Sequence, residues 1–133
     1  MIAVDSSIVV RLLTKDDPRQ AAAAESLFAA GPIWIAKTVL LETVWVLRSL
    51  YGFDEGAIRG ALEHLLGLKN VYTEDKPSMA AALQLTVHGI ELADTIHYVS
   101  RPPGAMFVSF DKSFVRRAKR AGETDVSEFP AKR

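Results

Sequence analysis

The alternation of apolar and polar positions divides the chain into short strand-like runs and longer helical segments. Residues 2–4, 33–36, 70–73 and 106–109 form short runs rich in β-branched and aromatic side chains, and a last short strand is expected near residues 125–127. Between these runs, apolar residues recur every three to four positions, the period of a helix. We therefore expect an α/β protein, a three-layer α/β/α sandwich with a central parallel sheet.

Several local signals set the bounds of the expected helices. Pro18 fits the first turn of a helix through the alanine-rich segment, and the Gly-Pro pair at residues 31–32 ends it. Residues 39–50 are apolar at almost every position, which is typical of a helix in the core. Trp34 and Trp45 are interpreted as core residues on the same ground, although an exposed aromatic ring could stack on a nucleic-acid base.

Two carboxylates lie close together in the stretch 89–97, which otherwise has the pattern of a buried helix. Glu91 and Asp94 are three residues apart, so on a helix they point the same way and repel each other. Such a pair needs a compensating charge, either an Arg or Lys partner or a divalent cation held by oxygen ligands. In the alternative interpretation, Asp94 only caps the helix and Glu91 is solvated.

Asp5 and Asp111 each stand where a strand gives way to a helix. In open α/β sheets, ligands bind in the crevice outside the carboxyl ends of the strands, so both positions favour a functional role. Either residue could instead be only the N-cap of the helix that follows it.

Glu42 is the one acid within the apolar segment 39–50. A carboxylate in such a setting demands a partner, because an unpaired charge is costly to bury. It either forms a buried ion pair with Arg11 or Arg48, or lines a cleft where it meets a cation. We favour the cleft, since that setting also explains why the residue stays charged.

Length and composition bound the remaining possibilities. The 133 residues are enough for one domain, expected to span 1–133, and no apolar run approaches the length of a membrane span. There is no cysteine, hence no disulfide framework, and the N-terminus lacks the pattern of a signal peptide, so we expect a cytoplasmic protein with no membrane partner. Sixteen basic and sixteen acidic side chains cancel. Nucleic-acid binding would therefore depend on a local patch, such as the basic residues of 112–120.

The chemistry best suited to these acids is that of a hard divalent cation. A set of oxygen ligands fits Mg²⁺ or Mn²⁺, which can lower the pKa of a bound water and neutralise charge on a phosphoryl group, so no Ser, Cys or His nucleophile is required. The chain has no G-x-S-x-G, Walker or H-E-x-x-H motif. His64, His88 and His97 are interpreted as structural or surface residues.

Four motifs together resemble the PIN domain and, more closely, the VapC-type ribonuclease toxins of toxin–antitoxin modules. They are Asp5-Ser6-Ser7, Glu42 in the segment 41–47, Glu91-x-x-Asp94 running into Ile96-His97, and Ser109-Phe110-Asp111-Lys112. The resemblance spans essentially the whole chain, and the motifs occur in the family's order and spacing.

This resemblance implies a metal-dependent endoribonuclease that hydrolyses RNA phosphodiester bonds. By motif match, the catalytic, metal-binding acids are Asp5, Glu42, Asp94 and Asp111, with Ser7, Glu91 and Ser109 in supporting positions. Glu91 stands where the family usually has Asp. Lys112, Arg116 and Arg117 are candidates for binding RNA phosphates.

The same resemblance implies a small antitoxin protein as partner, and a homodimer is expected. Two alternatives stay open: a housekeeping RNA-processing nuclease, and a non-catalytic PIN-like interaction domain. An aspartate-nucleophile phosphatase is disfavoured, because Ser7 stands where its second Asp would be required.

Overall fold

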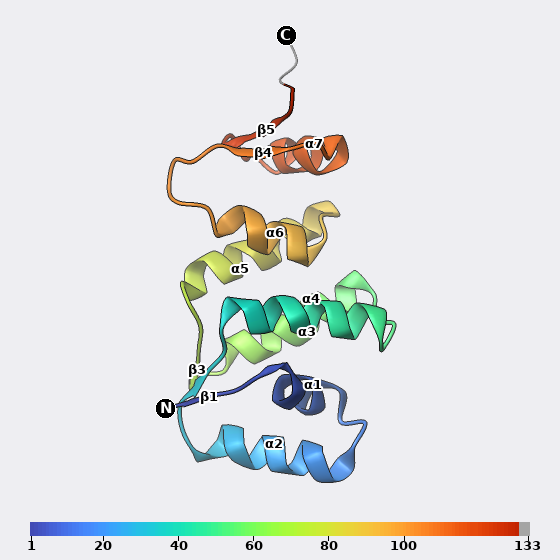
Figure 1. Ribbon diagram of the computed structural model, residues 1–133, viewed down its shortest axis with the longest axis vertical. Helices are drawn as coiled ribbons and strands as arrows, with labels where there is room; N and C mark the ends of the chain where they lie inside the picture. Colours follow the sequence, from blue (N-terminus) through green and yellow to red (C-terminus); the bar gives the residue numbers. More distant parts are fainter. Residues whose placement is uncertain (131–133) are drawn as a thin grey trace. The chain divides into compact units, whose positions relative to one another are not determined.

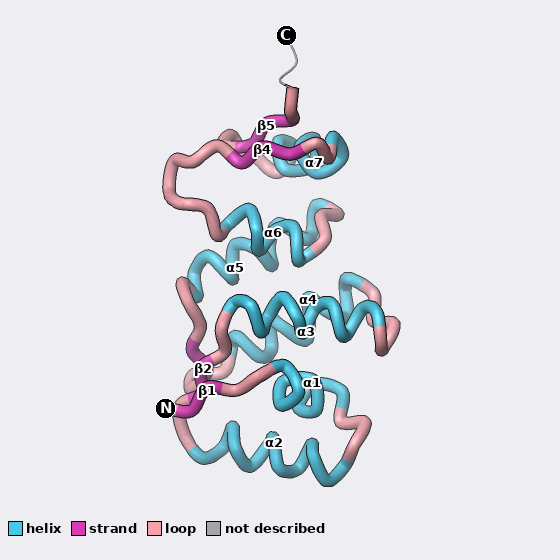
Figure 2. The backbone as a smooth tube through the Cα atoms, viewed as in Figure 1, coloured by secondary structure: helices cyan, strands magenta, loops and turns pink. Residues whose placement is uncertain are grey.

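The computed structural model describes residues 1–130 and has the α/β composition expected from the sequence (Figures 1 and 2). The chain falls into two compact units, Met1–Lys76 and Pro77–Arg133. All strand pairs are parallel, which confirms the α/β class with parallel strands.

The first unit is built on a three-stranded parallel sheet. Its elements are β1 (Ile2–Ala3), α1 (Ser6–Thr14), α2 (Pro18–Ala30), β2 (Ile33–Trp34), α3 (Lys37–Ser49), α4 (Glu55–Gly67) and β3 (Val71–Tyr72). The strand order is β1-β2-β3, with Ile2 beside Ile33 and Ile33 beside Val71. The strands are shorter than the apolar runs that predicted them, because only two residues of each run are paired with a neighbouring strand.

Local capping explains where the helices of this unit begin. Asp17 accepts hydrogen bonds from the amides of Arg19 and Gln20, with Pro18 in the first turn of α2. Asp54 accepts from the Ala57 amide at 2.8 Å and caps α4. These helix starts are the ones that the sequence predicted.

The second unit combines helices with a two-stranded parallel sheet. Its elements are α5 (Lys76–Leu85), which begins at the boundary, the 3-10 turn η1 (Thr86–His88), α6 (Leu92–Val99), β4 (Phe107–Ser109), α7 (Lys112–Arg120) and β5 (Val126–Glu128). β4 pairs with β5, with Phe107 beside Val126 and Ser109 beside Glu128.

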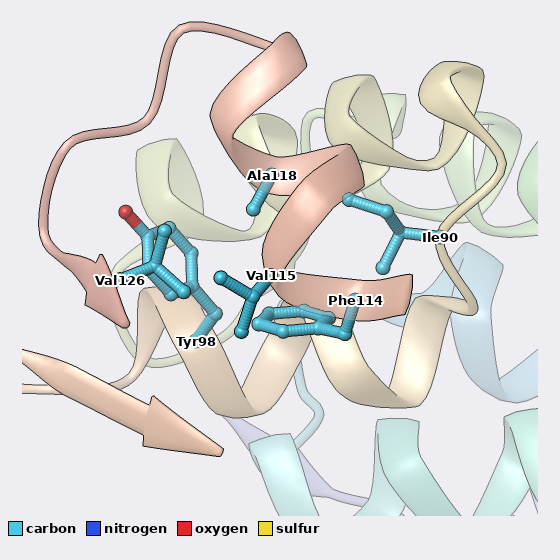
Figure 3. Close-up of a cluster of buried hydrophobic side chains, with 6 residues drawn as sticks. All are labelled: Ile90, Tyr98, Phe114, Val115, Ala118 and Val126. Carbon is cyan, nitrogen blue, oxygen red and sulfur yellow. The ribbon is translucent and has the colours of Figure 1, made fainter. Parts of the chain in front are cut away.

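Aromatic packing forms the core of the second unit (Figure 3). Tyr98 makes edge contacts with Phe107 and Phe114 at centroid distances of 5.6 and 6.2 Å. The Tyr98 hydroxyl donates to Glu123 at 2.8 Å, and burial, followed by this hydrogen bond, raises the pKa of Tyr98 to about 12. This core sits directly behind α7, the helix that follows Asp111.

Two expectations about helices are corrected by the structure. Trp45 is not a core residue: it is 57% exposed, because α3 turns Leu40, Val44 and Leu47 inward and presents its opposite side to solvent.

Among the described residues, none of the helices is long and apolar enough to cross a membrane.

Glu91 is the second correction, because it precedes α6 instead of lying within it. Gly89 has a left-handed backbone (φ +82°) that ends the 3-10 turn, and Glu91 occupies the extended N-cap position of α6. Asp94 lies in the first turn of α6, where the helix dipole favours a negative charge.

Candidate metal centre

Asp5 sits in the turn between β1 and α1, and its side chain caps α1. The amides of Ser7 and Ile8 donate to its Oδ1 atom at 3.1 and 3.3 Å, and the Ser7 hydroxyl donates to the same atom at 2.6 Å. The Ser7 hydroxyl, followed by the Ile8 amide, holds the pKa of Asp5 below its ordinary value. The capping interpretation is thus confirmed. The Oδ2 atom takes part in none of these bonds, and Asp5 is an exposed residue.

Glu42 is linked to the same turn. The Ser6 hydroxyl donates a hydrogen bond to Glu42 Oε1, and Glu42 is exposed on α3. Its exposure contradicts the alternative of a buried ion pair, and the favoured role of meeting a cation in a cleft stays a prediction. The arginines considered as its partners bind elsewhere, Arg11 to Asp16 at 3.2 Å and Arg48 Nε to Glu55 at 2.9 Å. Two consecutive serines therefore hold one carboxylate each.

Acids of the second unit line a pocket of about 300 Å³. Glu91, Asp94 and Asp111 all contribute to its wall. Asp111 caps α7 by accepting from the Phe114 amide at 3.0 Å, and its own amide donates to Ser109 Oγ at 2.9 Å. Ser109 therefore holds the backbone of Asp111, whereas Ser7 bonds to the carboxylate of Asp5, and N-capping is confirmed for Asp111 too.

Arg117 enters this acidic pocket from α7. Its Nη1 atom donates to the carbonyl of Gly89, and a Cβ atom added to Gly89 would lie 2.7 Å from that nitrogen. The basic residues of α7 are thus divided: Arg117 faces the acids, whereas Lys112 and Arg116 line a separate groove. Sequence reasoning had treated the three as one phosphate-binding group.

A separate cavity of the second unit has a volume of about 620 Å³. Arg101 lies in its wall, stacked 4.0 Å from the centre of the Tyr98 ring and bonded to the Ala105 carbonyl and to Asp125. These contacts hold Arg101 in the cavity wall, and the lining of this cavity includes none of the four predicted metal-binding acids.

The donor atoms of the candidate residues suit a hard divalent cation. Carboxylate and hydroxyl oxygens are the ligands that Mg²⁺ and Mn²⁺ prefer. Within the described residues of either unit, no group of three or more His, Asp or Glu side chains is arranged to hold a metal ion. Ser7 and Ser6 link Asp5 and Glu42 to one turn, and Asp94 and Asp111 line one pocket, whereas metal binding by these four acids stays a prediction.

Sequence reasoning missed Ser6 and the place of Arg117. The hydroxyl of Ser6 donates a hydrogen bond to Glu42, which is 36 residues away in the sequence. The only sequence signal for a role of Ser6 is that two adjacent serines follow the first strand. His64, His88 and His97 are all exposed, as the sequence predicted for surface residues.

A search of curated proteins and a search of solved structures returned no match. The family model of the PIN domain matches residues 2–120, most of the chain. PIN domains generally are nucleases that act on RNA and bind divalent metal ions, on a three-layer α/β/α fold with a parallel sheet. The chain belongs to the PIN domain family.

Proposed function

We propose that this protein is an Mg²⁺- or Mn²⁺-dependent endoribonuclease, a single PIN-like domain over residues 1–133, and the toxin of a toxin–antitoxin pair. Asp5, Glu42, Asp94 and Asp111 are the proposed metal ligands. The observation that carries the proposal concerns charge. Asp5, Glu42 and Asp111 form no ion pair with a Lys or Arg among the described residues of the unit to which each belongs. Carboxylates that are held in place, by a serine hydroxyl at Asp5 and Glu42 and by a helix amide at Asp111, but are not paired with a cation of the chain are suited to receive a metal ion.

The residues around these acids have distinct tasks in this proposal. Ser7 and Ser109 fix Asp5 and Asp111 through the hydrogen bonds described above, and Ser6 orients Glu42. When bound, the metal supplies a water of lowered pKa and neutralises charge on the phosphoryl group. Hydrolysis forms a bond from the water oxygen to phosphorus and breaks a P–O bond of the RNA backbone.

Glu91 and Arg117 act as supporting charges of the acidic pocket. Glu91 keeps a negative charge at the pocket wall from the N-cap of α6. Arg117 brings a guanidinium to the same wall, where its planar set of donors can bind a phosphate oxygen of the substrate.

A cleavage assay tests the nuclease. RNA hydrolysis should require Mg²⁺ or Mn²⁺, stop with a chelator, and fall at least about 100-fold in Asp94→Asn, since loss of one charged group at a reacting centre has effects of this order. The control is Asp54→Asn, which removes the charge of another acid at a helix start that lies outside the motifs. Cleavage that survives Asp94→Asn would assign the activity to another site or to a contaminant.

The toxin role rests on the VapC resemblance and on surface features. Trp45 of α3 and Leu50, the C-cap of that helix, are 57% and 68% exposed, an apolar surface suited to a small antitoxin or to a second copy in a homodimer. An antitoxin Arg or Lys could also occupy the acidic pocket. Expression of the wild type alone in the cytoplasm should slow growth, and co-expression with the protein of a neighbouring gene should restore it. Equal growth of wild type and Asp94→Asn would favour a housekeeping nuclease or a binding domain.

A further inference from the structure

Two phenylalanines form an exposed aromatic pair beside Asp111. Phe110 is 80% exposed and Phe129 is 60% exposed, and their ring centroids are 5.8 Å apart at an interplanar angle of 80°. Neither ring belongs to the core of the second unit, which is formed by other aromatic residues. Two large apolar rings kept together in solvent suggest a binding role, since neither contributes its full burial to folding.

Hydrogen bonds fix the backbone that carries this pair. The Phe129 amide donates to the Ser109 carbonyl at 3.0 Å, which joins the segment after β5 to the end of β4. The Asp111 amide donates to Ser109 Oγ at 2.9 Å, so Phe110 lies between two anchored residues of the candidate metal centre. A ring presented from a fixed turn loses little conformational entropy when a ligand binds.

A cationic groove is lined in part by residues that are close in sequence to Phe110 and Phe129. It has a volume of about 530 Å³ and is lined by Lys112, Val115, Arg116, Lys119, Arg120 and Glu128. Lys112 is two residues after Phe110, and Glu128 immediately precedes Phe129. Four basic side chains against one carboxylate make this groove positive, in a chain whose total charge is zero.

We propose that Phe110 and Phe129 form a nucleobase-binding site, which takes one unpaired base next to the scissile phosphate while the α7 groove holds the adjoining phosphates. The proposal rests on the proposed nuclease function and adds the residues that recognise the substrate. Aromatic rings stack on bases of any sequence, and Lys and Arg bind the backbone, so the combination fits RNA better than an apolar protein segment. The base must be unpaired, because a base inside a duplex is already stacked on its neighbours.

Binding of a short fluorescent RNA, measured by anisotropy in EDTA, tests this site without any cleavage. Phe110→Ala should weaken binding of the single strand about tenfold, the lower part of the range for loss of one base–aromatic stack. Phe110→Trp should retain the affinity of the wild type, since it keeps a ring. Because Phe110 is mostly exposed, its replacement leaves the core intact, which circular dichroism verifies.

Abasic nucleotides placed one at a time along the RNA sharpen the test. For the wild type, an abasic nucleotide at one position of the RNA should weaken binding about as much as Phe110→Ala does. The Phe110→Ala variant should bind that abasic RNA no more weakly than it binds the intact RNA. Tyr72→Ala is the matched control, because Tyr72 is 45% exposed on β3 of the other unit and should not change affinity. Arg116→Gln should instead weaken binding to single strands and duplexes alike and lower the salt dependence by about one phosphate contact.

The outcomes separate this inference from the proposed nuclease. The base site is refuted if Phe110→Ala binds single strands as the wild type does, if the wild type binds no RNA, or if light scattering shows that Phe110→Ala only splits a dimer into monomers. Phe110-dependent binding without metal-dependent cleavage would retain the base site and refute the nuclease. Metal-dependent cleavage together with RNA binding that does not depend on Phe110 would retain the nuclease and refute the base site.

Discussion

Replacing Asp5 by asparagine or by alanine separates the two roles of its side chain, capping α1 and carrying a charge. Asparagine is as good an N-cap as aspartate and can still accept from the Ser7 and Ile8 amides, whereas alanine removes every bond to Oδ1. We therefore expect Asp5→Ala to lose about 1 kcal/mol of stability, and Asp5→Asn to lose only a few tenths.

Thermal unfolding in EDTA at neutral pH measures this difference. For a chain of this size, about 1 kcal/mol corresponds to a fall in Tm of roughly 3–5 °C. Both variants should lose nuclease activity, because both lack the negative charge, so activity and stability change together only in Asp5→Ala. The reasoning is refuted if Asp5→Asn unfolds as easily as Asp5→Ala, or if it retains activity.

The pH dependence of stability gives an independent check on Asp5. Its pKa in the folded protein lies below the ordinary value of 3.8, so ionised Asp5 stabilises the fold above that pH. This contribution is lost as the pH falls from 3.8 through the lowered pKa. The stability advantage of wild type over Asp5→Asn should therefore shrink in that acid range, and an advantage that grows on acidification would have the wrong sign.

Three further predictions concern residues of the second unit. Gly89→Ala should lower the free energy of unfolding by about 1–2 kcal/mol, because residue 89 has a left-handed backbone. It should also move Arg117, whose Nη1 would lie 2.7 Å from the new Cβ. Chemical denaturation should show a smaller loss of stability when the same substitution is made in an Arg117→Ala background. Mn²⁺ at 100 times its Kd should raise stability by about 2.7 kcal/mol in thermal melts, and Asp111→Asn, which keeps a capping side chain, should abolish this gain. Tyr98 should ionise near pH 12 in an ultraviolet titration, in a step absent from Tyr98→Phe; since its pKa is raised, its contribution to stability is present below pH 10 and is lost as the pH rises through about 12.

Local sequence determined the order of elements and most helix starts. A cap bonds to amides two or three residues ahead, so Asp5, Asp54 and Asp111 mark helix starts without reference to distant parts of the chain. The motifs that contain the acids also sufficed to identify the family, because order and spacing along the chain are themselves sequence properties.

Tertiary structure decided which side chains meet. Ser6 bonds to Glu42 across 36 residues and Arg117 to Gly89 across 28, and no local pattern selects such partners. Trp45 is exposed although its helix is apolar at most positions, because packing of the neighbouring elements determines which side of a uniformly apolar helix is buried. The sequence therefore predicts which acids and basic residues are candidates for the site. Only packing determines that Arg117 lines the acidic pocket while the other cations of α7 line a separate groove.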